Sequence, residues 1–215
     1  EQSSTFFHWL RYAKCRNLRK FKMNCFVCGH SFVSRLRTYI TGNGRYSSSR
    51  NSAEFRVSDH VSQVEIAGVP GSKVLPTFDL PRLLHRLDFD IVIIDNGSND
   101  LSNGSHPLSV ANALMECAQS LIRNGRAKVV IICAALQRTR SRIAISKYQR
   151  NVIWFNQILK NFCEPELRIH FHPHYGFSSP PSEWSSDGIH PNSTTGIQKY
   201  KKFIRQAILK GARLC

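Results

Sequence analysis

The chain has 215 residues, enough for one domain with a buried core. Hydrophobic residues make up 41% and charged residues 20% of the sequence, which excludes a disordered protein, and the longest apolar run is far too short to cross a membrane. A net charge of +16 makes contact with nucleic acid or another polyanion a hypothesis, although no aromatic-rich RNA-binding motif accompanies the charge.

The N-terminal segment differs in composition from the rest of the chain. Residues 1–22 contain six basic residues and one acidic residue, and the first methionine is Met23. We therefore expect 1–22 to be a basic tail outside the core and 23–215 to form the domain, whose true start would lie near Met23. An odd number of cysteines, seven, and no signal-peptide pattern after Glu1 indicate reduced thiols in an intracellular, cytoplasmic setting.

Short apolar runs alternate with segments of helical period. Five runs of strand length are predicted: Cys25 to Cys28, Val61 to Ala67, Ile91 to Asp95, Val129 to Leu136 and Leu167 to Phe171. Three helices are predicted: Leu108 to Asn124, Tyr148 to Phe162, and a last helix after Thr194 that is expected to stop at Gly211. Two segments rich in small, polar or proline residues are expected to be loops: Tyr39 to Asp59 and His172 to Pro191. This alternation predicts a doubly wound α/β fold with a parallel sheet.

Ligands bind such sheets at the carboxyl ends of the strands, so the residues after each strand are informative. Four short motifs occur there in chain order: Gly29-His30-Ser31-Phe32, Gly68-Val69-Pro70-Gly71, Gly97-Ser98-Asn99-Asp100 and Asp187-Gly188-Ile189-His190. Each motif alone would more often be a turn or a helix cap. Their joint occurrence at successive strand ends favours one shared site.

The first and last motifs contain the parts of a nucleophilic site. Ser31 follows a strand and opens a helix, His190 can remove its hydroxyl proton, and Asp187 can hold the imidazole in the right tautomer. The oxyanion of an ester reaction needs donors placed in advance. The Ser31 N–H, the Gly68 N–H and the Asn99 side-chain amide are the candidates.

This set of motifs resembles the SGNH, or GDSL-like, hydrolase family from about Asn24 to Leu209. The resemblance implies that Ser31, Gly68, Asn99 and His190 are the four family residues, with Asp187 as the carboxylate of the last block. It also implies a flavodoxin-like α/β/α sandwich around a five-stranded parallel sheet. The implied reaction is hydrolysis of an acetyl, acyl or lipid ester through an acyl-enzyme, without a metal or an organic cofactor.

One position departs from the family pattern, because His30 stands where the family usually has Asp. The resemblance implies a hydrogen-bonding, site-shaping role for that position, which we extend to Gly97 and Asp100 beside Asn99. Gly-His-Ser-Phe-Val is similar to SGNH-like reading frames in invertebrate genomes, some of them linked to mobile elements such as LINE-type retrotransposons. The alternative function is therefore a catalytically weak or inactive module of this fold, for example one derived from a mobile element, that binds nucleic acid or another polyanion through its basic surface.

Two further predictions concern the loop before His190 and the cysteines. Tyr175, Phe177 and Trp184 precede the base and are predicted to wall the acyl or leaving-group pocket. A zinc site using the Cys25/Cys28 pair is disfavoured, because residues three apart on a strand point to opposite faces. His170 and His172 are read as ordinary edge or loop residues.

Overall fold

The computed structural model describes residues 22–42, 48–75, 88–174 and 181–215. Its strands are β1 (Met23–Gly29), β2 (Val61–Gly68), β3 (Phe89–Asp95), β4 (Ala127–Cys133) and β5 (Ile169–His172). Its helices are α2 (Ser31–Thr41), α3 (Ser48–Glu54), α5 (Ser98–Ser102), α6 (Pro107–Arg123), α7 (Ile145–Cys163) and α8 (Thr195–Leu214), with a 3₁₀ turn, η2 (Pro181–Glu183). No helix in these ranges is both long enough and apolar enough to span a bilayer.

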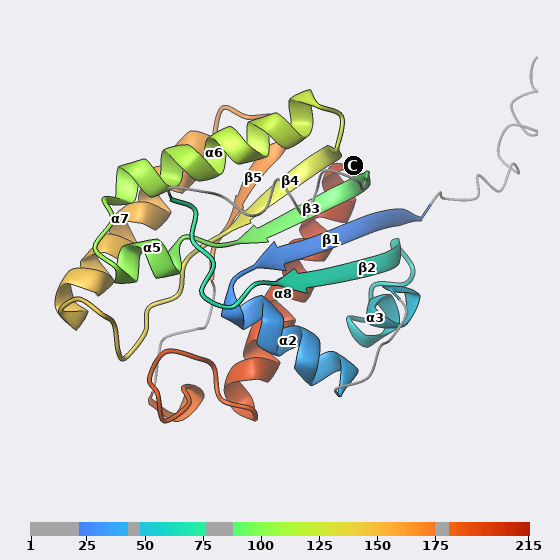
Figure 1. Ribbon diagram of the computed structural model, residues 1–215. Coiled ribbons are helices and arrows are strands. Elements are labelled where there is room, and N and C mark those ends of the chain that lie inside the picture. Colours follow the sequence, from blue (N-terminus) through green and yellow to red (C-terminus); the bar gives the residue numbers. More distant parts are fainter. Residues whose placement is uncertain (1–21, 43–47, 76–87, 175–180) are drawn as a thin grey trace, which may run out of the picture.

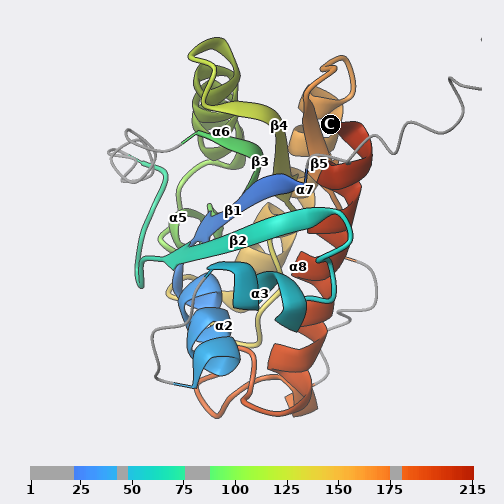
Figure 2. The same cartoon turned by 90° about the vertical axis from the view of Figure 1, so that its right-hand side faces the viewer.

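The five strands form one parallel sheet in the order β2-β1-β3-β4-β5. Helices α5, α6 and α7 cover one face, and α2, α3 and α8 cover the other (Figures 1 and 2). The predicted three-layer α/β/α sandwich is confirmed. Because all strands run the same way, their carboxyl ends meet at one edge, where β1 leads into α2 and β3 into α5 (Figure 1).

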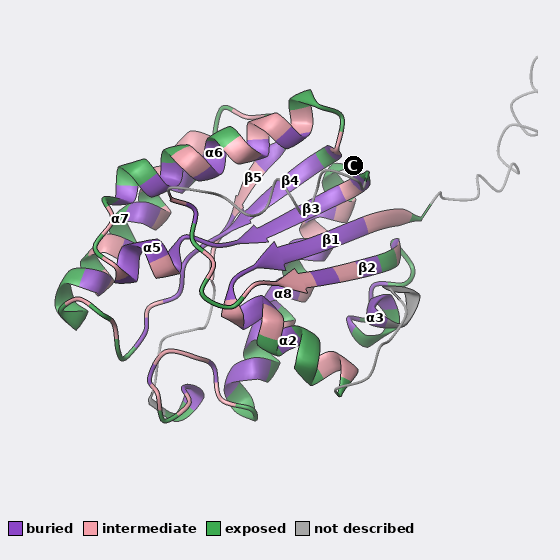
Figure 3. Ribbon diagram, in the orientation of Figure 1, coloured by how far each residue is buried: buried purple, intermediate pink, exposed green. Residues whose placement is uncertain are grey.

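The core is divided in two by the sheet, and the central strands are buried along almost their whole length (Figure 3). Ile91 and Ile93 pack with one layer of helices, while Val92 and Ile94 pack with the other, and all four are fully buried. Cys25 and Cys28 likewise belong to opposite layers. The sheet therefore separates the two thiols, as expected from their spacing.

The prediction that Tyr39 to Asp59 is a loop is wrong at its start, where α2 runs to Thr41, and in its second half, which contains α3. The side chains that made the segment look like a loop dock this helix on the edge strand β2. Asn51 donates from Nδ2 to the Val64 carbonyl at 3.0 Å, and the Ser52 hydroxyl donates to the Val61 carbonyl. Phe55 is fully buried just after the helix, so polar composition here reflects contacts with strand carbonyls rather than exposure to solvent.

The predicted end of the last helix is also wrong. Helix α8 runs to Leu214, and Gly211 lies inside it against β3. A Cβ at position 211 would come within 2.5 Å of Ile91 Cγ2, so the glycine permits close helix–sheet packing instead of ending the helix. Strand β4 ends at Cys133, three residues before the predicted Leu136, and the predicted second loop contains η2 and a β-bridge between Trp184 and Pro191.

Candidate active site

Ser31 lies at the carboxyl edge of the sheet, where β1 gives way to α2. His30 is the residue between them and the N-cap of the helix. Ser31 is the first residue of α2, so its N–H has no partner within the helix and is available to an anion. The Ser31 hydroxyl lies at the carboxyl end of the sheet, where it lines a cleft.

Ser31, His190 and Asp187 form a continuous hydrogen-bonded series. His190 Nε2 lies 2.9 Å from Ser31 Oγ, and His190 Nδ1 lies 2.7 Å from Asp187 Oδ2. The other carboxylate oxygen of Asp187 accepts the backbone N–H groups of Ile189 and His190 at 2.8 and 2.9 Å. These bonds fix a tight turn, so that the carboxylate orients the imidazole toward a serine 159 residues earlier in the chain.

The electrostatics of the pair favour an ionised Asp187 and a neutral His190. Burial alone would raise the pKa of Asp187, but the hydrogen bonds from His190 and from the two backbone N–H groups lower it to about 2. Burial lowers the pKa of His190, the bond to Asp187 opposes this, and the positive charges of Arg35 and Arg138 lower it further. His190 is thus held neutral near pH 7, the state that a general base requires.

His30 is buried beneath the site, with 1% of its surface exposed. Its Nδ1 accepts the N–H of Phe32 at 3.4 Å and lies 3.5 Å from Ser31 Oγ. Since Nδ1 accepts, the ring proton is on Nε2, which donates to Ser98 Oγ at 2.9 Å. Burial, followed by the positive charge of Arg138, lowers the pKa of His30 well below its usual value, so the ring caps α2 as a neutral acceptor.

Asn99 sits in α5 with its amide oriented by two neighbours. Its Oδ1 accepts from Arg138 Nη2 at 3.2 Å, and its Nδ2 donates to the Ser72 carbonyl at 3.0 Å. These contacts fix which end of the amide is the donor, and one of the two Nδ2 hydrogens is left for the cleft. Arg138 is itself 2% exposed, and the same Nη2 donates to Ser98 Oγ at 2.7 Å.

Gly68 is not placed to donate to an oxyanion beside Ser31. The register pairs Gly68 with Gly29, while the neighbouring Val69 N–H donates to the Gly29 carbonyl at 2.9 Å. Alternate residues of a parallel ladder direct their N–H groups to the same neighbour, so the Gly68 N–H faces away from β1. The glycine is needed for packing instead, because a Cβ there would come within 2.1 Å of the Ser34 backbone nitrogen in α2.

Gly71, three residues later, lies where Gly68 was expected. It lines the same cleft as Ser31 and Asn99, and its φ of +76° with Pro70 before it is that of a type II turn. The turn is closed by the Ser72 N–H, which donates to the Val69 carbonyl at 3.1 Å. The turn itself does not use the Gly71 N–H, which makes it the better donor candidate.

The two residues that flank Ser98 and Asn99 hold their loop in place. Gly97 has a φ of +100° and caps α5, where a Cβ would press within 2.9 Å of the Phe155 ring. Asp100 is fully buried, and its carboxylate accepts the Val74 and Leu75 N–H groups, each at 2.9 Å. Burial raises the pKa of Asp100 although these bonds oppose it. Both residues therefore hold the loop that carries Asn99 in place.

Trp184 does not lie in the cleft. It is 5% exposed, belongs to the same core layer as α2 and α8, and packs its ring 6.2 Å from that of Phe32. A β-bridge pairs Trp184 with Pro191, next to His190 in the chain. It therefore supports the site as a core residue and does not wall a substrate pocket. Tyr175 and Phe177 lie outside the described residues, as does almost all of the predicted tail.

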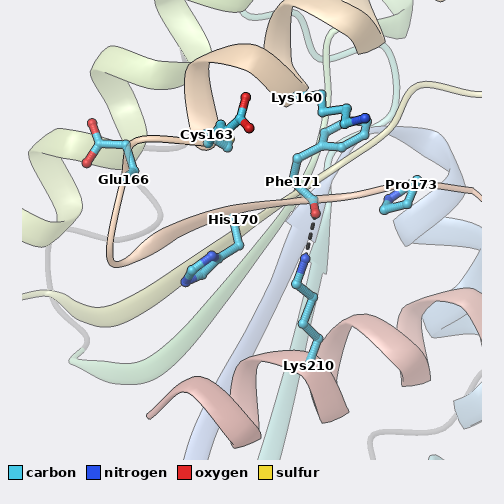
Figure 4. A pocket seen from close by; sticks show the side chains of 8 residues that line it. Lys160, Cys163, Glu166, His170, Phe171, Pro173 and Lys210 are labelled. Atoms are coloured by element: carbon cyan, nitrogen blue, oxygen red, sulfur yellow. Dashed lines mark hydrogen bonds between the residues drawn. The ribbon is translucent and has the colours of Figure 1, made fainter.

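The cleft at Ser31 has a volume of about 270 Å³. Its lining residues come from all four motif regions and from the segment after β4: Ser31, Pro70, Gly71, Lys73, Asn99, Ser102, Asn103, Arg138, Arg142, Ile189 and His190. A larger cavity of about 490 Å³ lies elsewhere, beside β5, where Lys210 Nζ donates to the Phe171 carbonyl at 2.7 Å (Figure 4). It includes none of the candidate catalytic residues.

The sequence prediction missed several residues that line the cleft, among them Gly71 and Arg138. Gly71 carried a signal, because Pro-Gly directly after a strand predicts a type II turn with a positive φ at the glycine. Arg138 carried no such sequence signal, apart from its position after a predicted strand. It belongs to the stretch from Arg123 to Arg150, which contains eight basic residues and no acidic one. The net charge of such a stretch suggests an exposed basic surface, whereas the Arg138 guanidinium is buried over the rings of Phe32 and Tyr148.

Comparison with known proteins agrees with the fold and the motifs. The GDSL-like lipase/acylhydrolase family matches residues 29–195, which is most of the chain, and the chain belongs to that family. A comparison with curated proteins gave no significant match.

Several solved structures share the fold at low sequence identity. A Bacteroides fragilis protein assigned as an acylhydrolase has a TM-score of 0.66 and 16% identity over 99% of each chain. A GDSL-like lipase from Bacteroides thetaiotaomicron has a TM-score of 0.62 and 16% identity over 96% of this chain and 97% of its own. The psychrotrophic esterase EstA from Pseudoalteromonas sp. has a TM-score of 0.62 and 14% identity over 87% of this chain and 97% of its own.

Proposed function

We propose that the protein hydrolyses carboxylic esters through an acyl-enzyme, with Ser31 as nucleophile, His190 as general base and Asp187 as the orienting carboxylate. The observation that carries the proposal is the series of contacts from Asp187 through His190 to Ser31, at 2.7 and 2.9 Å, which opens on the cleft. Membership of the GDSL-like lipase/acylhydrolase family and the likeness to an esterase support the same reaction class.

Acylation begins when His190 Nε2 takes the hydroxyl proton as Ser31 Oγ bonds to the ester carbonyl carbon. Asp187 stabilises the imidazolium that results. Negative charge then develops on the carbonyl oxygen, and the donors for it are the Ser31 N–H, the Gly71 N–H and the remaining Asn99 amide hydrogen. The carbon–oxygen bond to the alcohol breaks, and His190 returns its proton to the leaving oxygen. A water molecule repeats the sequence on the acyl-enzyme, releasing the acid and restoring Ser31.

The substitution of His30 for the usual Asp is compatible with this mechanism. The imidazole supplies an acceptor to the N–H of Phe32, so α2 keeps a side-chain cap. His30 Nδ1 is 3.5 Å from Ser31 Oγ, whereas His190 Nε2 is 2.9 Å away. The serine proton therefore has its closer acceptor in His190, the ring that is paired with a carboxylate.

The proposal is tested by hydrolysis of 4-nitrophenyl acetate by the purified protein. Ser31→Ala is expected to abolish enzyme-dependent release of nitrophenol and to leave thermal unfolding nearly unchanged. Ser34→Ala is the matched control, because Ser34 lies in the same helix but does not line the cleft. A Ser31→Ala protein as active as the Ser34→Ala protein would overturn the assignment of the nucleophile.

A further inference from the structure

Basic side chains surround the nucleophile without an acidic residue among the cleft's lining residues. Lys73, Arg138 and Arg142 all line the cleft with Ser31 and His190. In the described part of the chain, no carboxylate lies within the 4.0 Å of an ion pair from any of these three cations. An excess of positive charge therefore faces the position that an ester substrate would occupy.

The buried position of Arg138 makes this excess of positive charge unfavourable for the folded protein. Its guanidinium is 2% exposed, its Nη2 bonds only neutral oxygens, and its Nε is buried without an acceptor among the described residues. A buried cation without a carboxylate partner is unfavourable unless something else compensates it. The rings of Phe32 and Tyr148, 5.2 and 5.8 Å from Arg138 Cζ, and the buried carboxylate of Asp95, which lies beyond ion-pair distance, compensate only in part.

Arg142 and Lys73 are held at the rim of the cleft by contacts of their own segments. Arg142 Nη1 donates to Asn103 Oδ1 at 3.0 Å, and its backbone N–H donates to Ser102 Oγ at 3.1 Å. Lys73 directly precedes the two residues whose N–H groups bind the buried carboxylate of Asp100. Asp100 thus fixes the Lys73 segment, while its two oxygens are occupied by backbone N–H groups and do not line the cleft.

We propose that the cleft is built for esters that carry a negative charge, a carboxylate or a phosphate, close to the scissile carbonyl, with Lys73 and Arg142 as the residues that hold that charge. Arg138 lies deeper and reinforces the same preference while it orients Asn99. The inference rests on the proposed ester hydrolysis and adds a substrate class to it. Such a charge could belong to the acyl group or to the alcohol, and the two arms of the experiment separate these sources.

The experiment compares matched charged and neutral esters with the full-length protein. The acyl arm uses mono-4-nitrophenyl glutarate against its methyl ester, and the alcohol arm uses 4-acetoxybenzoate against methyl 4-acetoxybenzoate. Each kcat/KM is corrected for the background rate measured with the Ser31→Ala protein. The double variant K73Q/R142Q is compared with K202Q/R150Q, which removes the same charge from exposed positions that do not line the cleft.

The wild-type protein is expected to prefer the charged ester in at least one arm by about tenfold, the scale of a hydrogen bond to a charged group. K73Q/R142Q should remove most of that preference, whereas K202Q/R150Q should keep it. Added salt should reduce the preference, since rim charges are screened. Equal preference in the two double variants, or a wild-type preference for the neutral esters, would overturn this inference alone. Absence of turnover on every ester would contradict the proposed function as well.

Discussion

His30 Nδ1 accepts the N–H of Phe32 at 3.4 Å, so an imidazole provides the side-chain cap of the helix that carries the nucleophile. The ring also packs edge-on against Phe32, with centroids 4.5 Å apart. A histidine in place of the family's usual Asp therefore keeps the hydrogen-bonding function of the position while burying a neutral ring.

Two substitutions of His30 distinguish the contribution of the helix cap to stability from that of the ring. His30→Asn retains a side-chain acceptor for the N–H of Phe32, whereas His30→Ala does not. We expect His30→Ala to unfold with about 1 kcal/mol less free energy than His30→Asn, the usual cost of losing an N-cap. Urea denaturation measures the difference, and equal stability of the two variants would show that the cap contributes nothing.

Gly68 is predicted to matter for packing rather than for catalysis. Gly68→Ala places a methyl group within 2.1 Å of the Ser34 nitrogen, so α2 must move away from β2. We expect a loss of roughly 1–3 kcal/mol in the free energy of unfolding, typical of overpacking. Gly42→Ala is a useful comparison, because position 42 also ends an element but has open space around its Cβ, although its φ of +55° adds some strain. A Gly68→Ala protein that is no less stable than wild type would refute the packing role.

Trp184 should affect stability far more than substrate choice. Its ring is buried against Phe32 behind the cleft, and its removal leaves a large cavity. Trp184→Ala is expected to cost about 3–5 kcal/mol, while Trp184→Phe should cost less because it refills part of the space. The ratio of kcat/KM for 4-nitrophenyl acetate to that for 4-nitrophenyl butyrate should stay the same in Trp184→Phe. A changed ratio with unchanged stability would restore Trp184 as a pocket residue.

The rate of ester hydrolysis should rise with pH and level off below neutrality. The neutral form of His190 is the active base, and its pKa is lowered from the ordinary histidine value of 6.5, chiefly by burial. Activity is thus lost as the pH falls through that lowered pKa, with a midpoint below 6.5. Asp187→Asn removes the negative charge that opposes this lowering of the His190 pKa and that stabilises the imidazolium, so kcat should fall roughly 10²–10⁴-fold, the range for lost acid–base assistance. A midpoint above 7 in the wild-type profile would contradict the role of His190.

The fold and most of the site were predictable because both follow from the order of strands. Ile91 to Ile94 are apolar on both faces, which requires helices on both sides of the sheet, and parallel strands bring Ser31 and His190 to one edge. The Pro70-Gly71 pair signalled a turn, but the choice between Gly68 and Gly71 as the oxyanion donor also depends on the register of β2 against β1, which the sequence does not give. Helix α3 was missed for a similar reason, since Asn51 and Ser52 are used by strand carbonyls that only the folded chain brings near.

The basic surface stays a hypothesis alongside the enzyme. Thirty lysine and arginine residues against fourteen acidic ones favour binding of a polyanion by charge alone. Such binding would fall steeply with salt concentration, would not depend on Ser31, and is compatible with either an active or an inactive site.

The most direct test of the account is the reaction of the purified protein with a fluorophosphonate probe, followed by mass-spectrometric mapping of the labelled residue. An activated serine is predicted to react at Ser31 alone, and His190→Ala should slow that labelling strongly, because the base that removes the hydroxyl proton is lost. Absence of labelling at Ser31, together with salt-sensitive binding of RNA by the same preparation, would contradict the hydrolase and favour an inactive, nucleic-acid-binding member of the family.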